Sequence, residues 1–216
     1  MPAVTILIPV KEPHHSKTRL SGLLNSSQRS KLTLNMLLRV IKASVSSSVV
    51  DIVVAGGTFN PLKQLIKERA FPSVRWVDVL GRDLNNDVEL ASAVIRNSGR
   101  AYIYIPGDVP FISRDDIEEI IKSSEDGKTI VFVPSESDGG TNAMLVPAEI
   151  TFKPHLGVDS LKKHCEYAER NTWAYRIIRP SGLALDLDTE RDLEHCEEIE
   201  SGFLDRLGAL HEGMLE

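Results

Sequence analysis

Short apolar segments alternate with amphipathic ones along this chain, and that alternation limits the possible folds more than any other feature. Residues 4–10 and 49–55 are almost wholly apolar, which is typical of strands buried on both faces. Between them, residues 26–45 carry apolar side chains at three- and four-residue steps, which predicts a helix. Strands that alternate with helices are joined by right-handed crossovers. The sequence therefore predicts one α/β domain, residues 1–216, with a mostly parallel, doubly wound sheet.

The remaining elements follow this pattern at first and then become less regular. Further strands are expected at 74–79, 101–105, 129–133, 143–146, 174–179 and 183–187. Further helices are expected at 60–69, 87–98, 114–123 and 157–169. The irregular second half predicts an insertion that lets part of the sheet run antiparallel. The C-terminal segment has apolar residues at helical spacing, which favours docking on the chain's own core over a dimer contact: Phe203, Leu204, Leu207, Leu210 and Met214.

Composition and charge exclude several classes of protein. The net charge is −6, whereas a nucleic-acid surface requires a basic face. No apolar run approaches the roughly 20 residues of a membrane span. The N-terminus shows no secretion signal, so Cys165 and Cys196 are expected to be reduced thiols, and no Cys and His spacing fits zinc. We therefore expect a cytoplasmic protein whose partners are small molecules, with neither a nucleic acid nor a membrane among them.

Two acidic segments each follow a predicted strand. Asp108 ends one of them, and Asp186 and Asp188 end the other. A carboxylate just past a strand lies at the carboxyl edge of an open α/β sheet, where ligands bind. Asp186 and Asp188 are two residues apart, so in extended structure they point to the same side and repel unless they share a cation. These hard oxygen ligands suit Mg²⁺ with substrate phosphates; the alternative is a turn residue and a solvated strand end.

The loop after the first predicted strand is basic. It brings Lys11, Lys17 and Arg19 to the usual phosphate site of a doubly wound sheet, and such groups suit a triphosphate. The glycines of a Walker loop or of G-x-G-x-x-G are missing, so recognition is expected from side chains. An exposed basic loop is the alternative. The adjacent His14 and His15 are not expected to be ligands, because no acidic or thiol partner lies at suitable spacing.

Asn85 follows the third predicted strand. Its amide offers a donor and an acceptor, which suits a base edge or a ribose hydroxyl. Helix capping by Asn85 or Asn86 is the alternative.

Two later segments carry groups suited to a small acid. Thr141 follows two glycines that let the backbone approach a ligand closely. Gly157 and Ser160 stand at the start of a predicted helix, where free N–H groups and the dipole bind anions. Capping of that helix by Asp159 or Ser160 is the competing explanation.

Taken in order, these motifs resemble the 2-phospho-L-lactate guanylyltransferase family, which makes an early intermediate of a deazaflavin coenzyme. The resemblance spans nearly the whole chain. It rests on these segments: Pro9-Val10-Lys11, Ser16-Lys17-Thr18-Arg19-Leu20, Gly107-Asp108-Val109-Pro110, Gly140-Thr141-Asn142-Ala143-Met144-Leu145, Gly157-Val158-Asp159-Ser160-Leu161 and Asp186-Leu187-Asp188-Thr189. The chain departs from the family where a glycine-Leu-Asn segment gains two residues before Asn85.

The resemblance implies a nucleotidyltransferase fold like that of the A-type glycosyltransferases, which nucleotide-diphospho-sugar transferases share. It implies two metal ions, expected to be Mg²⁺, on one set of residues: Asp108, Asp186 and Asp188. It implies a phosphorylated three-carbon acid near a second set: Thr141, Gly157 and Ser160. Phosphoenolpyruvate in place of phospholactate is an alternative that the motifs do not separate.

The resulting hypothesis is that the phosphate of 2-phospho-L-lactate attacks the α-phosphorus of GTP and that pyrophosphate leaves. Lys17 and Arg19 are expected to hold the β- and γ-phosphates, with Lys11 near the α-phosphate. Lys17 and the three aspartates form the expected catalytic set. The alternatives are a nucleotidyltransferase acting on another small phosphorylated acid or sugar, a nucleotide-sugar glycosyltransferase, and a non-catalytic nucleotide-binding subunit. A homodimer is also expected as an option.

Overall fold

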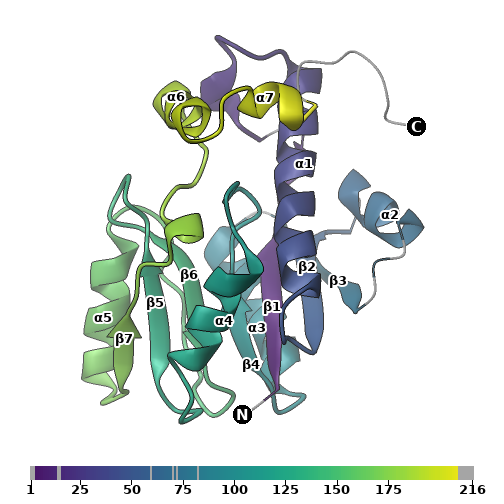
Figure 1. Ribbon diagram of the computed structural model, residues 1–216. Helices are drawn as coiled ribbons and strands as arrows, with labels where there is room; N and C mark the ends of the chain where they lie inside the picture. The colour runs from purple at the N-terminus through teal and green to yellow at the C-terminus, as the bar shows by residue number, and fades with distance from the viewer. Residues whose placement is uncertain are drawn as a thin grey trace.

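A central sheet is flanked by helices on both faces in the computed structural model, which describes residues 3–13, 16–58, 60–69, 71, 73–81 and 83–208 (Figure 1). Within these residues the sheet has seven strands in the order β3-β2-β1-β4-β6-β5-β7. The strands are β1 (Val4–Pro9), β2 (Asp51–Gly57), β3 (Val74–Val79), β4 (Ala101–Tyr104), β5 (Ile130–Pro134), β6 (Thr141–Val146) and β7 (Tyr175–Ile177).

Strand direction confirms the predicted mostly parallel, doubly wound sheet. β1 runs parallel to β2 and β4, β2 runs parallel to β3, and β5 runs parallel to β7. β6 runs antiparallel to both of its neighbours, β4 and β5, so the predicted antiparallel part is also confirmed. Because β6 runs against β4, the first residue of β6, Thr141, lies at the edge where β1 and β4 end.

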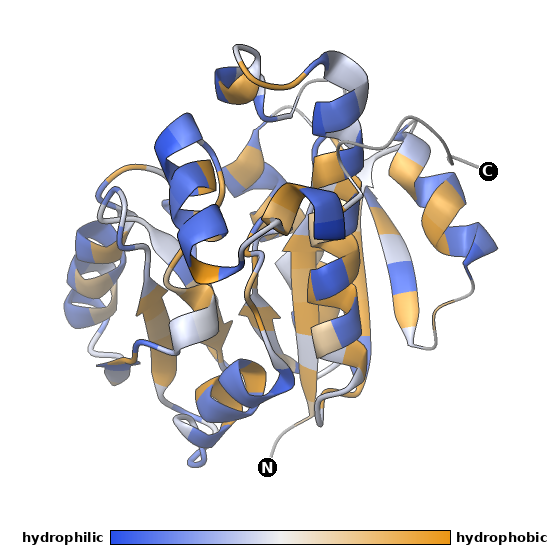
Figure 2. Cartoon of the chain, turned by 45° about the horizontal axis from the view of Figure 1, so that its top comes forward, coloured by the Kyte–Doolittle hydropathy of each residue, from blue (hydrophilic) through white to orange (hydrophobic). Residues whose placement is uncertain are grey.

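Helices cover the two faces of the sheet in different groups. The helices are α1 (Ser26–Val45), α2 (Pro61–Glu68), α3 (Leu84–Arg96), α4 (Arg114–Lys122), α5 (Ser160–Arg170), α6 (Glu190–Ile199) and α7 (Phe203–Arg206). Residues of α1, α2 and α4 pack with Ile6 and Ile8 on one face, and residues of α3 and α5 pack in the cluster of Leu7 on the other. Figure 2 shows largely hydrophobic strands inside helices that carry both kinds of residue.

Side-chain caps fix where several helices begin. Three of them start with a capping box, in which two side chains satisfy each other's backbone N–H groups: Asn25 with Gln28, Ser113 with Asp116, and Thr189 with Asp192. Asp83 caps α3 by accepting a hydrogen bond from the backbone N–H of Asn86. Capping by Asn85 or Asn86 was therefore the wrong alternative, because Asp83 stands one residue before the helix.

One predicted strand is wrong, because residues 183–187 join no sheet. The chain forms the short 3₁₀ helix η3 (Ser181–Leu183) and then an extended segment, in which the Leu187 N–H donates to the carbonyl of Asp108 in a loop. The alternating leucines look like a strand because Leu183 and Leu187 are both buried. They are buried in two different clusters, however, and not on one face of a sheet.

The C-terminal helices dock on the chain's own core, as predicted. Phe203 and Leu207 are buried with residues of α1, α6 and the loop after β1. Leu210 and Met214 lie outside the described residues, and a dimer contact stays a prediction. Cys165 and Cys196 are free thiols. Among the helices that the structure describes, none combines the length and the apolar character needed to cross a bilayer.

Candidate active site

A cavity of about 460 Å³ opens at the carboxyl edge of the parallel strands. Its walls come from the loops after β1, β3 and β4, from the start of β6, and from the segment before α6. This edge is where open α/β sheets bind ligands, and the volume is typical of a small-molecule site. The fold therefore gathers at one place several loops that are far apart in the sequence.

Most of the predicted site residues line this cavity. The lining includes Lys11, Lys17, Arg19, Asp108, Thr141, Gly157, Asp186 and Asp188. Two predicted residues, Asn85 and Ser160, are not among the lining residues that the structure describes. His14 and His15 belong to the same loop as Lys17 but lie outside the described residues.

Lys17 joins the basic loop to both acidic segments. Its ammonium lies 2.6 Å from Asp108 Oδ2 and 2.6 Å from Asp188 Oδ1, and its side chain is only 4% exposed. Lys17 adopts a left-handed backbone conformation, with φ of 54°, just before the 3₁₀ helix η2 (Thr18–Leu20). This turn directs the ammonium inward while Arg19, two residues later, remains exposed.

The electrostatics of these groups are strongly linked. Burial lowers the pKa of Lys17, but the charges and hydrogen bonds of Asp108 and Asp188 outweigh burial and raise that pKa above its usual value. Burial raises the pKa of Asp188, but Lys17, with smaller contributions from Arg19 and Lys11, lowers it overall. The Lys17 ammonium and the Asp188 carboxylate are therefore charged near neutral pH.

Asp186 has different partners from Asp188 although both face the cavity. Its Oδ1 accepts hydrogen bonds from Ser135 Oγ at 3.1 Å and Ser137 Oγ at 3.4 Å, and it lies 3.4 Å from Asn142 Nδ2. Burial, with repulsion from Asp108 and Asp188, raises the pKa of Asp186. The three carboxylates therefore lie close enough to repel one another.

The predicted metal ligands do not converge on a single point in this arrangement. Among the described residues, no three acidic, histidine or cysteine side chains form a group that could hold a metal ion, and Lys17 bridges two of the carboxylates. The donor chemistry nevertheless fits Mg²⁺, since all three groups offer hard oxygen ligands, and burial, with repulsion from Asp108 and Asp188, raises the pKa of Asp186. Metal binding by the three aspartates stays a prediction.

Thr141 and Ser160 form one hydrogen-bonded unit beside the cavity. Ser160 Oγ donates to Thr141 Oγ1 at 3.0 Å, and Ser160 is wholly buried. Thr141 reaches the cavity, as does Gly157 with a φ of 121°. Any influence of the Ser160 side chain on a ligand must therefore pass through Thr141.

The N-terminus of α5 offers less to an anion than the sequence predicts. The Ser160 N–H donates to the carbonyl of Gly157, and the Leu161 N–H donates to the carbonyl of Gly139. Asp159 precedes the helix with a left-handed φ of 56°, and no side chain caps it. Capping by Asp159 or Ser160 is therefore also wrong, since backbone carbonyls of the glycine-rich loops satisfy these groups.

Asn85 connects two walls of the cavity from behind. Its side-chain oxygen accepts from the Leu156 N–H at 2.6 Å, and its amide nitrogen donates to the Leu156 carbonyl at 3.3 Å. In contrast, Asp83 and Asp87 of the same region line the cavity. Base recognition by Asn85 stays a prediction, although the amide is occupied by the backbone in this arrangement.

Comparison with known families assigns the chain. A family described as "Guanylyl transferase CofC like" matches residues 4–200. The chain belongs to this family. The match runs from β1 to the end of α6 and so includes every loop that forms the cavity. The resemblance inferred from the motifs is confirmed, and the protein is a nucleotidyltransferase.

Individual guanylyltransferases resemble the chain over most of its length. It is 32% identical over 187 residues to the phosphoenolpyruvate guanylyltransferase of Roseiflexus castenholzii, covering 87% of this chain and 84% of that protein. It is 30% identical over 193 residues to the 2-phospho-L-lactate guanylyltransferase of Methanocaldococcus fervens, covering 87% and 82%. The two relatives are named for different acids, and both are guanylyltransferases.

Solved structures confirm the fold expected for this family. A putative nucleotide-diphospho-sugar transferase from Desulfovibrio desulfuricans G20 superposes with a TM-score of 0.78 at 17% identity, covering 95% of each chain. A CMP:2-keto-3-deoxy-manno-octonic acid synthetase complexed with CTP gives a TM-score of 0.62 at 12% identity, covering 91% of this chain and 98% of that chain. At these identities the likeness concerns the fold alone.

Sequence reasoning missed several residues of this guanylyl transferase site. Tyr104 lines the cavity at the end of β4, and burial, with the charges of Asp108 and Asp186, raises its pKa. Ser135 and Asn142 hold Asp186. Asn142 could have been found, since it directly follows Thr141 in a quoted motif; Ser135 and Tyr104 carry no signal beyond their places at strand ends.

Proposed function

We propose that this guanylyl transferase joins 2-phospho-L-lactate to GTP, giving lactyl-2-diphospho-5'-guanosine and pyrophosphate, a step in deazaflavin coenzyme biosynthesis. One observation supports the proposal above all. A single cavity brings together the basic loop, three carboxylates and the Thr141 wall in a member of a guanylyl transferase family. We take residues 1–216 as one catalytic domain, since the family match covers residues 4–200.

The reaction exchanges one phosphoanhydride bond for another. A phosphate oxygen of the acid forms a bond to the α-phosphorus of GTP, and the bond from that phosphorus to the bridging oxygen of the β-phosphate breaks. The bridging oxygen keeps the bonding electrons and leaves as pyrophosphate. The attacking oxygen is already an anion near neutral pH, so the reaction needs no strong general base. The main barrier is the repulsion between two highly charged anions.

The basic loop supplies the cations that offset this repulsion. Lys17 and Arg19 hold the β- and γ-phosphates, where ammonium and guanidinium groups form charge-assisted hydrogen bonds. Lys11 lies near the α-phosphate. Since Lys17 bridges Asp108 and Asp188, its transfer to the phosphates would free both carboxylates.

The freed carboxylates are suited to hold metal. Asp108, Asp186 and Asp188 would hold the expected Mg²⁺ ions, with Ser135 and Asn142 keeping Asp186 in place by hydrogen bonds. When bound, Mg²⁺ offsets negative charge on the attacking and leaving oxygens. Thr141 and Gly157, which also line the cavity, orient the acid, and Ser160 acts through Thr141.

Phosphoenolpyruvate is the second candidate acid. The 32% identical relative from Roseiflexus castenholzii is named as a phosphoenolpyruvate guanylyltransferase, and this observation favours the second candidate. Both acids carry a carboxylate beside a phosphate ester on a three-carbon skeleton. The same chemical step serves either acid.

Pyrophosphate release tests the proposal directly. The purified protein is incubated with Mg²⁺, one nucleoside triphosphate and one acid, and pyrophosphate is followed with time. Release that requires both GTP and 2-phospho-L-lactate is the expected result. Release with GTP and phosphoenolpyruvate, but not with GTP and 2-phospho-L-lactate, changes the acid but keeps the mechanism. Folded protein that releases no pyrophosphate with any pairing contradicts the proposal and favours a glycosyltransferase or a non-catalytic binding subunit.

A further inference from the structure

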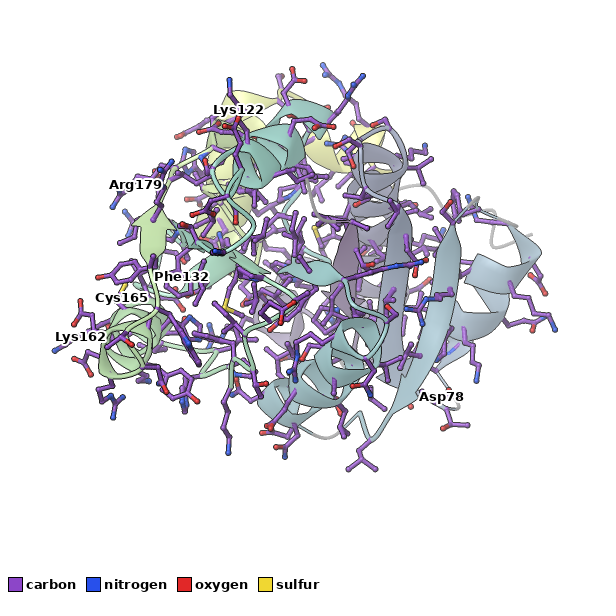
Figure 3. The ribbon with its side chains drawn as sticks, turned by 90° about the horizontal axis from the view of Figure 1, so that it is seen from below. Asp78, Lys122, Phe132, Lys162, Cys165 and Arg179 are labelled. Atoms are coloured by element: carbon purple, nitrogen blue, oxygen red, sulfur yellow. The ribbon has the colours of Figure 1, made fainter. Side chains whose placement is uncertain are left out.

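His164 is a wholly buried polar residue beside the cavity that the proposed mechanism does not use. It lies on α5, between the helix and the sheet, stacked on the ring of Phe132 with centroids 5.6 Å apart and edge-on to Phe152 at 5.5 Å. Figure 3 shows Phe132 on the side of the sheet near α5, the helix that carries Lys162 and Cys165. A polar ring held among aromatic side chains needs partners for both nitrogens.

The backbone determines which nitrogen of His164 carries the hydrogen. The His155 backbone N–H donates to His164 Nε2 at 2.9 Å. A backbone N–H can only donate, so Nε2 must be the acceptor, and the single hydrogen of a neutral ring then sits on Nδ1. Burial, with smaller effects from the charges of His155 and Lys163, lowers the pKa of His164 to about 4, so the ring is neutral near pH 7.

The Nδ1–H of this tautomer lies 3.0 Å from Thr141 Oγ1 and donates to it. The same oxygen also accepts the hydrogen bond from Ser160 Oγ at 3.0 Å. A hydroxyl has two acceptor positions and one hydrogen. With both acceptor positions filled from inside the protein, the hydroxyl of Thr141 can act only as a donor to a ligand.

We propose that His164 is a positioning residue that, together with Ser160, fixes the Thr141 hydroxyl as a hydrogen-bond donor toward the acidic substrate. The inference rests on the proposed function, in which Thr141 orients the acid. A donor with no free acceptor position favours an anionic oxygen, a carboxylate or a phosphate, over a group that must donate. We call these hydrogen bonds from His164 and Ser160 to Thr141 the relay. The relay allows a neutral threonine to recognise an anion.

Two substitutions separate the two nitrogens of His164. The side-chain nitrogen of asparagine can stand near the position of Nδ1 and donate to Thr141, whereas the terminal amide of glutamine reaches the position of Nε2 and can accept from His155. His164→Gln is expected to raise the KM for the acid by roughly ten- to hundredfold with little change in the KM for GTP. His164→Asn is expected to recover most of that loss. The reverse order would overturn the proposal, because it would mean that support of the His155 backbone is what matters.

A double-mutant cycle tests whether His164 acts through Thr141. Thr141→Val removes the hydroxyl at nearly constant shape and is expected to raise the KM for the acid by a similar factor. In that background His164→Gln should add little, since the donor it orients is already gone. Tyr167→Phe, on the same helix and in the same aromatic cluster, is the control and should leave the KM for the acid unchanged. Fully additive effects of His164→Gln and Thr141→Val would contradict the relay.

The tautomer can be measured without turnover. Long-range proton–nitrogen NMR spectra of the labelled protein at pH 7 are expected to show His164 as the Nδ1–H tautomer, and the Nε2–H tautomer would overturn the inference. If the wild-type protein releases no pyrophosphate with either acid, the proposed function fails. Calorimetric titration with phosphoenolpyruvate and with 2-phospho-L-lactate then compares Thr141→Val with the wild type. If the two proteins bind each acid with the same affinity, the relay is overturned independently of turnover.

Discussion

Lys17 is the residue on which the opposite charges of the cavity meet. Its ammonium is shared between Asp108 and Asp188 in a largely buried position, so it neutralises part of the acidic cluster before any ligand binds. In the proposed function, the phosphates of GTP compete with these carboxylates for the same ammonium. On this proposal, transfer of the Lys17 ammonium from the protein carboxylates to the substrate phosphates leaves Asp108 and Asp188 free as metal ligands.

Replacement of this ammonium should affect one substrate far more than the other. Lys17→Ala is expected to raise the KM for GTP by about tenfold or more, the worth of a charge-assisted hydrogen bond, with a much smaller effect on the acid. Initial rates with each substrate varied in turn give both constants. Lys67→Ala, which removes an exposed lysine from α2, is the matched control. An equal rise for both substrates would argue against a triphosphate role.

Asp188 tests the metal assignment. Asp188→Asn keeps the shape of the side chain but removes its charge, and turnover is expected to fall by about a hundredfold or more while the protein remains folded. Rates at increasing Mg²⁺ and a circular dichroism spectrum measure the two effects. Asp115→Asn makes the same charge change at an exposed position of α4 and should leave turnover intact. A folded Asp188→Asn protein with a near-normal rate would show that this carboxylate holds no essential metal.

His164 makes folding stability depend on pH. Its pKa is about 4 in the folded protein against 6.5 for an ordinary histidine, so the unfolded chain binds the proton more tightly. The stability that neutral His164 contributes is fully present above about pH 6.5 and is lost as pH falls through 4. The total loss, once the ring is fully protonated, is ~3 kcal/mol. Urea unfolding of the wild type and His164→Asn at several pH values measures it as the change in their difference. A constant difference across that range would show that His164 is not the responsible group.

At the scale of elements, Asn85 couples the start of α3 to the loop before α5. Both hydrogen-bonding ends of its amide meet the backbone of Leu156, next to the cavity residue Gly157. In the proposed function, this link joins the part of the site that binds the nucleotide to the part that binds the acid. The amide can therefore act either as a clamp on the acid wall or, after rearrangement, as a reader of the base.

Asn85→Ala distinguishes these roles. As a clamp, Asn85 is expected to change the KM for the acid by about threefold to tenfold when removed, with the preference for GTP over ATP unchanged. As a base reader, its loss would reduce that preference instead. Pyrophosphate release with both nucleotides at varied acid concentration measures the two quantities. Asn86→Ala, which alters the exposed neighbouring amide, serves as the control.

The elements that the sequence predicted well are those whose burial follows one simple period. The helix expected at 26–45 is α1, since its apolar residues recur at helical spacing. The strand expected at 74–79 is β3, although its apolar residues divide between the two faces of the sheet. The segment 183–187 misled because its leucines reach different clusters. Helix α6 was missed because it buries only Leu193 and Cys196, although the capping box of Thr189 and Asp192 was visible.

The arrangement of the site was less predictable than its composition. Between β5 and β6 the register shifts: Val133 pairs with Ala143 but Pro134 pairs with Thr141, so Asn142 is an extra residue. Such a bulge re-aims side chains, and here Thr141 contacts α5 while Asn142 contacts Asp186. The motifs named the polar residues, but no local pattern encodes a shift that depends on two strands pairing.

At the scale of the whole molecule, the C-terminal helices support the site from outside. In Figure 1, α6 and α7 lie beyond the carboxyl ends of the strands, beside the amino-terminal end of α1. Their apolar residues join one cluster with Leu20, which follows Arg19, and with Leu187, which separates Asp186 from Asp188. The basic loop and the second acidic segment are therefore anchored in the same small core.

Phe203 is the largest side chain of that core, and its loss should affect both stability and nucleotide binding. Its ring is wholly buried, lies 5.7 Å from that of Phe111 and faces the guanidinium of Arg39 at 5.5 Å. Phe203→Ala is expected to lower the free energy of unfolding by about 3–5 kcal/mol. Because Leu20 and Leu187 then lose a shared partner, the KM for GTP is also expected to rise by severalfold, even at temperatures where the protein stays folded.

The matched control removes a similar apolar contact at the opposite end of the sheet. Ile121 is buried beside Val4 and Ala101, at the amino ends of β1 and β4, and Ile121→Ala is expected to cost about 2–5 kcal/mol. Urea unfolding and GTP kinetics for both variants separate general loss of stability from loss of support. If Ile121→Ala raises the KM for GTP as much as Phe203→Ala does, the C-terminal helices stabilise the fold without holding the basic loop in position. If only Phe203→Ala raises this KM, then the small core that Phe203 shares with Leu20 and Leu187 holds the basic loop in position for GTP.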